Sequence, residues 1–392
     1  MKVYDYLIIG AGIVGLAIAR ELQVRYPSAK IIILEKEAKV GLHSSGRNSG
    51  VLHSGIYYPS NSLKARVCSQ GAHEMEEFCS LYKVPLNRIG KILLPTDEKD
   101  NSQFEILEKR ASENNVTVHK LNSEALKELE PEAFSATGEA LYVPSTSVAD
   151  PSLVMKALVA EVGQLGVDIL YDVSSLNIYD ESGIITLSNG TRLAYGHLIN
   201  SAGLNADRVA HRCNVGKDYT LIPFKGIYWK LDRHAGIKIR HLIYPVPDLR
   251  VPFLGVHTTT SIDGSVYIGP TAVPALSREN YSGLNNLKAT EFMKIFSLLV
   301  RQVVDDNDGF RRLVWQEGRR FFKPWFVQAA QALVPNIKAR HILPCNKVGI
   351  RAQMYNTRTG TLASDFIVEK GISSTHVLNA ISPAWTSAFP FA

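Results

Sequence analysis

The chain opens with an apolar pattern that changes period twice within its first 35 residues. Residues 3–9 and 30–35 are short, continuous apolar runs, whereas residues 13–25 place their apolar positions at helical spacing. The first and last runs have the length of buried strands. This order predicts a strand, a helix and a second strand, with the two strands paired in parallel through a right-handed crossover.

The rest of the chain continues to alternate. Helical spacing is predicted over 62–83, 100–115 and 152–165, and strands over 167–171, 183–187 and 196–201. Between 221 and 269 the pattern becomes short β segments separated by proline and glycine, and residues 286–333 return to helical spacing. The alternation predicts an α/β fold. The longest apolar stretch, residues 6–19, is too short to cross a bilayer.

Composition narrows the class of protein. A chain of 392 residues with 45% hydrophobic residues can form one large or two medium domains. Its net charge of +6 is dispersed, so no nucleic-acid partner is expected. The four cysteines, Cys68, Cys79, Cys213 and Cys345, are scattered and predict neither disulfides nor a metal site. The N-terminus does not resemble a signal peptide, so we expect a cytoplasmic protein.

The strongest local motif lies between the first strand and the first helix. Gly10 permits a tight turn, Gly12 lets the backbone approach a pyrophosphate, and Gly15 lets the helix pack on the strand. The helix N-terminus then presents N–H groups to the phosphates. Glu35 ends the second strand and can accept hydrogen bonds from a ribose diol, which disfavours NADP. On this motif alone, FAD and NAD both remain open.

The segment after the second strand favours FAD. Residues 41–50 are rich in small polar side chains that can follow a long cofactor, and residues 51–58 should reach the isoalloxazine. The expected cofactor-binding residues in these two regions are Gly10, Gly12, Ile13, Val14, Gly15, Glu35, Lys36, Ser44, Ser45, Arg47, Asn48, Ser49, Gly50 and Val51.

Motifs along the whole chain resemble those of the glycine-oxidase-like (D-amino-acid oxidase) flavoproteins, and within them the L-2-hydroxyglutarate oxidase/dehydrogenase branch. Beyond the N-terminal motif, they lie at 48–58, 62–65, 243–248, 252–257, 263–265, 348–353 and 379–380. Residues 201–203 look like a second flavin motif, which adds Ala202 and Gly203 to the expected cofactor contacts, and Val173 looks like part of the approach to the adenine.

The resemblance implies a Rossmann-type FAD-binding domain on a parallel sheet, interleaved with an α+β substrate domain on a mixed or antiparallel sheet. We expect the FAD-binding domain to comprise 1–82, 140–217 and 338–392, and the substrate domain to comprise 83–139 and 218–337.

The resemblance also implies a reaction. The C2–H of a small 2-hydroxy acid faces flavin N5, and a base removes the hydroxyl proton as hydride leaves, which gives a 2-oxo acid. His53 is the first candidate for that base and His257 the second, because imidazole titrates near neutral pH. Arg351 is the candidate for binding the C1 carboxylate and for touching the cofactor. Further candidates for lining the substrate pocket are Tyr57, Lys225 and Tyr244.

The expected activity is therefore FAD-dependent oxidation of L-2-hydroxyglutarate or a close 2-hydroxy acid. Electrons would pass to oxygen or to a quinone, and a quinone would imply transient peripheral contact with the inner membrane. Two alternatives stay open: oxidation of an amine or amino acid such as glycine, sarcosine or an acidic amino acid, and flavin binding without turnover. The second arises because the family continues into a helix where this sequence stops at Ala392, which leaves at most a stub.

Overall fold

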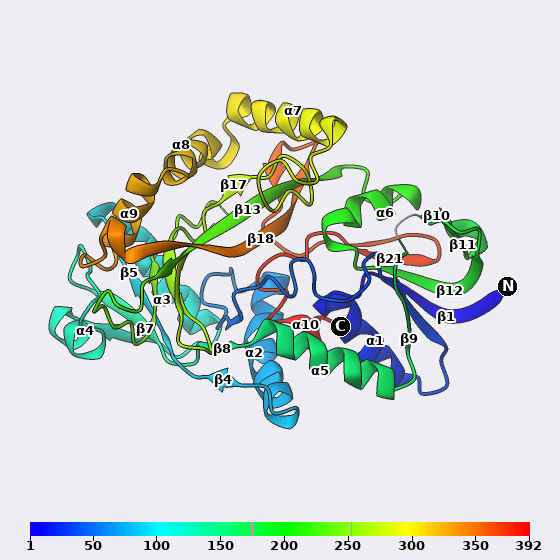
Figure 1. Cartoon of the computed structure of the whole chain (residues 1–392), viewed down its shortest axis with the longest axis horizontal. Coiled ribbons are helices and arrows are strands. Elements are labelled where there is room, and N and C mark those ends of the chain that lie inside the picture. Colours follow the sequence, from blue (N-terminus) through cyan, green and yellow to red (C-terminus); the bar gives the residue numbers. More distant parts are fainter. Residues whose placement is uncertain (174–175, 252) are drawn as a thin grey trace. The chain divides into compact units, whose positions relative to one another are not determined.

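A computed structural model describes residues 1–173, 176–251 and 253–392, and these form two compact units (Figure 1). The first unit comprises Met1–Asn48, Pro151–Pro223 and Arg351–Ala392. The second comprises Ser49–Asp150 and Phe224–Ile350. Two long strands carry the chain from one unit into the other, β13 (Tyr219–Leu231) and β18 (Ile342–Asn356).

The first unit is built on a sheet of eight strands in the order β10-β11-β12-β1-β2-β9, with β21 beside β12 and β20 beside β21. Strands β12, β1, β2 and β9 pair in parallel, as does β21 with β12. The strands are β1 (Lys2–Ile9), β2 (Ile31–Leu34), β9 (Asp168–Leu170), β10 (Leu176–Tyr179), β11 (Ile184–Leu187), β12 (Arg192–Asn200), β20 (Val368–Lys370) and β21 (Ser374–Val377). The predicted strand–helix–strand unit at the N-terminus is confirmed.

Helices of the first unit pack around α1 (Ile13–Arg25), whose apolar residues between Ile13 and Ala19 are buried. Arg20 joins α1 to α5 (Pro151–Gln164) through a 2.8 Å ion pair with Glu161. Its guanidinium also lies 5.3 Å from the ring centroid of Phe389 in α10 (Ala388–Phe391). The remaining elements are α6 (Ala206–Arg212) and β19 (Thr361–Leu362), which pairs with the end of β18.

The second unit is built on a larger sheet in the order β18-β13-β16-β15-β14-β5-β7-β6, with β17 beside β13. Every pairing resolved between these strands is antiparallel except β14 with β5. The strands are β5 (Lys91–Leu94), β6 (His119–Leu121), β7 (Ala140–Val143), β14 (Leu242–Pro245), β15 (His257–Thr260), β16 (Val266–Gly269) and β17 (Val273–Pro274). The expected mixed sheet is therefore present. The first of the expected short β segments is in fact the continuous 13-residue β13.

A three-stranded sheet and six helices complete the second unit. The small sheet joins β3 (Val51–Leu52), β8 (Ser147–Ala149) and β4 (Leu86–Asn87). The helices are α2 (Leu63–Leu81), α3 (Asn101–Glu113), α4 (Ser123–Leu129), α7 (Ala289–Asp305), α8 (Phe310–Arg320) and α9 (Lys323–Gln331). Within the described ranges, no helix combines the length and apolar character needed to span a membrane.

The compact units differ in their bounds from the expected domains. Residues 49–82, 140–150 and 338–350 belong to the second unit, and 218–223 to the first. The reason lies in packing: β3 and β4 both pair with β8, and Val51, Ile56 and Tyr57 join a core that also contains Leu93 and Phe104. Of the family-like motifs, Pro252 lies outside the described residues.

Candidate active site

The glycine turn after β1 is a backbone cradle that side chains would fill. Gly10 has a φ of +103°, and a Cβ there would lie 2.7 Å from the carbonyl oxygen of Ser201. A Cβ on Gly15 would lie 2.0 Å from the carbonyl oxygen of Gly10. The N-cap of α1 is Gly12, which brings no side chain to cap the helix. The cradle therefore fits a diphosphate at the helix N-terminus.

Glu35 faces this turn from the end of β2. Its Oε2 accepts a 2.9 Å hydrogen bond from the N–H of Ala11, and its Oε1 accepts one of 3.0 Å from the N–H of Glu37. The backbone carbonyl of Glu35 accepts the N–H of Val173 at 2.9 Å. The acid predicted to hold a ribose is thus fixed beside the glycine turn, and Val173 is fixed beside the acid.

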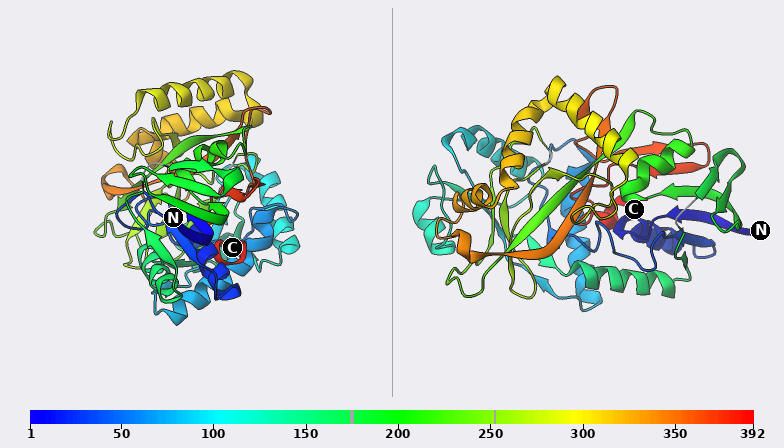
Figure 2. Two further views of the ribbon diagram at one scale, coloured as in Figure 1. Left: turned by 90° about the vertical axis from the view of Figure 1, so that its right-hand side faces the viewer. Right: turned by 45° about the horizontal axis from the view of Figure 1, so that its top comes forward.

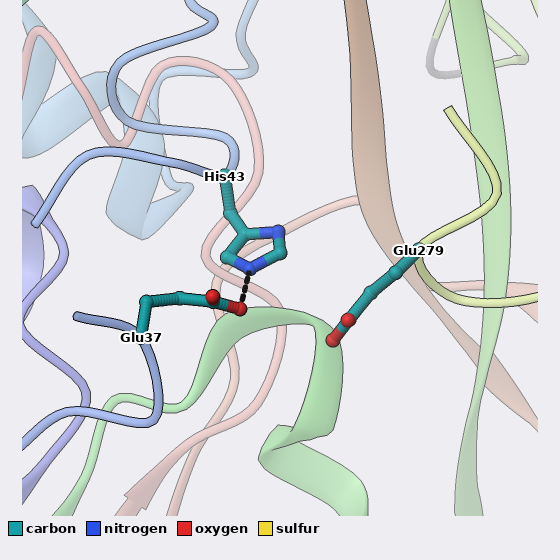
Figure 3. A group of neighbouring side chains, drawn as sticks. All are labelled: Glu37, His43 and Glu279. Carbon is teal, nitrogen blue, oxygen red and sulfur yellow. Dashed lines mark hydrogen bonds and ion pairs between the residues drawn. The ribbon is translucent and has the colours of Figure 1, made fainter. Parts of the chain in front are cut away.

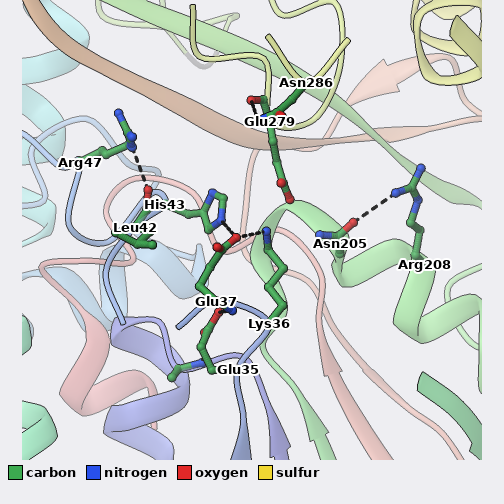
Figure 4. Close-up of polar contacts among 11 residues, drawn as sticks. Glu35, Lys36, Glu37, Leu42, His43, Arg47, Asn205, Arg208, Glu279 and Asn286 are labelled. Carbon is green, nitrogen blue, oxygen red and sulfur yellow. Dashed lines mark hydrogen bonds and ion pairs between the residues drawn. The ribbon is translucent and has the colours of Figure 1, made fainter. Parts of the chain in front are cut away.

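The loop after β2 carries a charged cluster (Figures 3 and 4). The carboxylate of Glu37 accepts hydrogen bonds from Lys36 Nζ at 2.6 Å and meets His43 Nε2 at 2.9 Å. These contacts, with Lys36 the larger influence, hold the pKa of Glu37 below its ordinary value. Arg47 closes the loop by donating to the carbonyl of Leu42 at 2.8 Å.

Ser45 and the second predicted flavin motif both contact the glycine turn. The Oγ of Ser45 accepts the N–H of Ile13 at 2.9 Å. Ser201 follows β12, and its hydroxyl lies 3.1 Å from the carbonyl oxygen of Gly10. The next residue, Ala202, donates its N–H to Asn200 Oδ1 at 3.1 Å. The structure therefore brings the N-terminal motif, Glu35, Ser45 and residues 201–203 together within one unit.

Three predicted site residues, the substrate candidates Tyr57 and Tyr244 and the base candidate His257, lie in the second unit close to a lysine that the sequence did not single out. The rings of Tyr244 and His257 stack at a centroid distance of 3.7 Å with 16° between their planes. Lys91 Nζ lies 4.5 Å from the ring centroid of Tyr57 and 5.6 Å from that of Tyr244. We call Tyr57, Lys91, Tyr244 and His257 the lysine cluster.

The amino group of Lys91 is unusual for a charged group. Its side chain is 0% exposed, and Nζ has no hydrogen-bond partner among the described residues. Burial lowers the pKa of Lys91 from its ordinary 10.5 to about 7. A buried ammonium without an anionic partner is costly, and such perturbed groups gather at functional sites. Lys91 is thus poised to pair with an anion.

His257 presents one nitrogen to the backbone. Its Nδ1 lies 2.9 Å from the carbonyl oxygen of Gly255, which can only accept, so Nδ1 carries the proton and Nε2 is the basic atom of the neutral ring. His53 is buried in the segment after β3, and its carbonyl accepts the thiol of Cys68 at 3.2 Å. Neither of these contacts tests which histidine acts as the base, so both proposals remain.

The other predicted site residues lie as follows. Lys225 is half-buried on β13 and donates a 3.2 Å hydrogen bond to Asn280 Oδ1, a residue outside the lysine cluster. Arg351 is half-buried on β18 at the start of the last segment of the first unit. Asn48 ends the first segment of that unit, whereas Ser49, Gly50 and Val51 lie in the second.

The chain is similar to known oxidoreductases over nearly its whole length. A model of the FAD dependent oxidoreductase family matches residues 5–391. The L-2-hydroxyglutarate dehydrogenase of Salmonella houtenae is 35% identical over 391 residues, covering 99% of this chain and 91% of that protein. The mitochondrial L-2-hydroxyglutarate dehydrogenase of Homo sapiens is 33% identical over 406 residues, covering 98% of this chain and 86% of that protein.

Solved structures show the same fold. L-α-glycerophosphate oxidase from Mycoplasma pneumoniae, with FAD bound, has a TM-score of 0.76 at 22% identity and covers 100% of this chain and 93% of its own. The match to glycine oxidase from Geobacillus kaustophilus has a TM-score of 0.71 at 16% identity, and it covers 100% of this chain and 92% of that protein. The predicted fold class and the predicted cofactor are both confirmed. The chain belongs to the family of FAD-dependent oxidoreductases.

Proposed function

We propose that this oxidoreductase converts L-2-hydroxyglutarate or a close 2-hydroxy acid to its 2-oxo acid. The curated relatives bearing that name are similar over nearly the whole chain. The observation in this structure that carries the proposal is the buried Lys91, which lacks a hydrogen-bond partner among the described residues. A dicarboxylate substrate supplies the anion that this amino group lacks.

Each carboxylate of the substrate has its own proposed cation. Arg351 binds the C1 carboxylate through a planar pair of hydrogen bonds, which orients the adjacent C2. Lys91 binds the distal carboxylate between Tyr57 and Tyr244.

The oxidation separates a hydride from a proton. Bound FAD would supply the acceptor for the hydride of C2. His53 takes the proton of the substrate hydroxyl, so that the C–O bond becomes the carbonyl of the 2-oxo acid. His257 is the alternative base, since its Nε2 is the basic nitrogen of the neutral ring. The electrons pass on to oxygen or to a quinone.

The backbone of the first unit holds the cofactor in this proposal. The glycine turn and the N-terminus of α1 bind the diphosphate, and Glu35 binds the adenosine ribose in place of its contact with the Ala11 N–H. The remaining proposed contacts are Lys36, Ser44, Ser45, Arg47, Asn48, Ser49, Gly50, Val51, Val173, Ala202, Gly203 and Arg351.

A substrate series with a dye acceptor tests the proposal. The parent protein should oxidise L-2-hydroxyglutarate in preference to the monocarboxylate L-lactate and to glycine and sarcosine. Lys91→Met should raise the KM for L-2-hydroxyglutarate about 10- to 100-fold, the range expected when a hydrogen bond between charged groups is lost. The KM for L-lactate should change little, because lactate has no distal carboxylate.

Two results would contradict this assignment. Turnover of glycine or sarcosine without turnover of any 2-hydroxy acid would replace the substrate class. An equal rise in KM for lactate and hydroxyglutarate in Lys91→Met would remove Lys91 from the distal carboxylate while leaving the reaction in place.

A further inference from the structure

Large apolar side chains are exposed in one region of the second unit far more than elsewhere. Of 25 large hydrophobic residues that are exposed in the described parts of the chain, 11 lie between Leu284 and Trp325. Single exposed apolar residues are normal on any protein surface, but a contiguous group marks an interaction site. These residues belong to α7, α8, the start of α9 and the segments just before α7 and α9, which follow one another along the unit (Figures 1 and 2).

Helix α7 exposes a row of large apolar side chains and buries two polar ones beside Ile295. Its exposed large apolar residues are spaced by three or four positions, as on one helical face, and are Met293, Phe296, Val300 and Val304. The opposite side buries Glu291 and Gln302, and Glu291 accepts the N–H of Arg278 at 3.1 Å. Since these polar groups are fixed inside, the apolar row faces outward as part of the fold.

Aromatic and basic side chains continue this face on α8 and α9. Trp315 is 66% exposed and Phe322 62%. The guanidinium of Arg319 lies 3.4 Å from the ring centroid of Trp325 and 5.6 Å from that of Trp315. Tryptophan and arginine in such contact suit the boundary between lipid headgroups and acyl chains.

The charge of α8 and the start of α9 is mostly of one sign. Between Phe310 and Trp325 there are five basic residues and one acidic residue. The acidic residue, Glu317, is buried and paired with Arg320. Arg311 also donates to the carbonyls of Val303 and Val304, which fixes α8 to the end of α7. The exposed charge on this part of the face is therefore positive.

We propose that this surface, the α7–α9 face, docks on an anionic lipid bilayer. The apolar row and the aromatic rings enter the headgroup boundary, and the arginines meet lipid phosphates. A second copy of the chain fits less well, because a symmetric dimer through this face brings like charges together. The inference goes beyond the proposed function and does not depend on which substrate the enzyme oxidises.

Flotation with lipid vesicles tests the proposal on the FAD-loaded full chain. Vesicles of phosphatidylcholine containing about one-third phosphatidylglycerol should carry the protein upward, and vesicles of pure phosphatidylcholine should carry much less. The double variant Phe296→Ser/Trp315→Ser should lower the bound fraction at least tenfold. Arg319→Gln should weaken binding about fivefold, as expected for one basic residue at a charged surface.

Phe134→Ser is the matched control, since Phe134 is an exposed aromatic residue of the second unit outside the α7–α9 face. It should leave vesicle binding unchanged, and all variants should keep bound flavin. No binding to anionic vesicles, or equal binding by the double variant, would overturn the proposal. A concentration-dependent dimer that Phe296→Ser/Trp315→Ser dissociates would assign the face to a second copy instead.

Discussion

Replacing Lys91 by methionine should stabilise the protein in a manner that depends on pH. Methionine keeps the length of the side chain but removes the buried charge. The pKa of Lys91 falls from 10.5 to about 7 on folding, which corresponds to a cost of about 4 kcal/mol for a lysine that unfolding would expose at pH 7. Loss of the contact with the Tyr57 ring offsets about 1–2 kcal/mol. The net gain at pH 7 is about 2–3 kcal/mol.

The pH dependence has a definite sign. Between pH 7 and 10.5 the unfolded lysine binds more protons than the folded one, so this group makes the parent protein more stable as pH rises. The gain from Lys91→Met should therefore be full below pH 7 and should disappear as pH approaches 10.5. Urea unfolding of the FAD-loaded parent and variant at pH 7 and at pH 10, followed by tryptophan fluorescence, measures this difference.

Lys109→Met serves as the control, because Lys109 is exposed on α3. It should change the free energy of unfolding little at either pH. If Lys91→Met changed stability by the same amount at both pH values, the amino group would not be buried as a perturbed base. The reasoning about the lysine cluster would then be refuted.

Three further substitutions test the site. Gly15→Ala should reduce bound FAD at least tenfold, since its Cβ would lie 2.0 Å from the Gly10 carbonyl oxygen. The control Gly163→Ala should retain FAD, because a Cβ there meets nothing within 4 Å. The flavin content per chain measures both. His53→Ala should slow flavin reduction by about 10²- to 10⁴-fold with FAD still bound, and a near-normal rate in stopped flow would exclude His53 as the base. Arg351→Ala should raise the dissociation constant of L-2-hydroxyglutarate about 10- to 100-fold. An unchanged affinity in an anaerobic titration would show that Arg351 does not bind the substrate.

Local patterns predicted the first unit well because its elements obey short-range rules. The apolar run before Gly10, the helical spacing after Gly12 and the acid at Glu35 each follow from neighbouring residues, and β1, α1 and β2 lie where the patterns indicated. The bounds between units were harder to predict. They depend on β3 and β4 pairing with β8, some 60 to 100 residues away in the sequence, which no local period encodes.

The substrate cluster shows the same limit. Tyr57, Tyr244 and His257 could be proposed from motifs, but their meeting around one amino group depends on the register that sets Leu93 beside Tyr244. Lys91 precedes Ile92, Leu93 and Leu94, and a lysine at the start of a strand is ordinarily solvated. The available signal was its position directly after Gly90 in an otherwise apolar run.

Anaerobic mixing of the FAD-loaded protein with L-2-hydroxyglutarate tests the central claim most directly. The account predicts that flavin absorbance bleaches with the L-hydroxy acid and forms one equivalent of 2-oxoglutarate, while D-2-hydroxyglutarate, glycine and sarcosine leave the flavin oxidised. A flavin that L-2-hydroxyglutarate leaves oxidised, but that glycine or sarcosine bleaches, would contradict the proposed substrate and the pairing of Lys91 with its distal carboxylate.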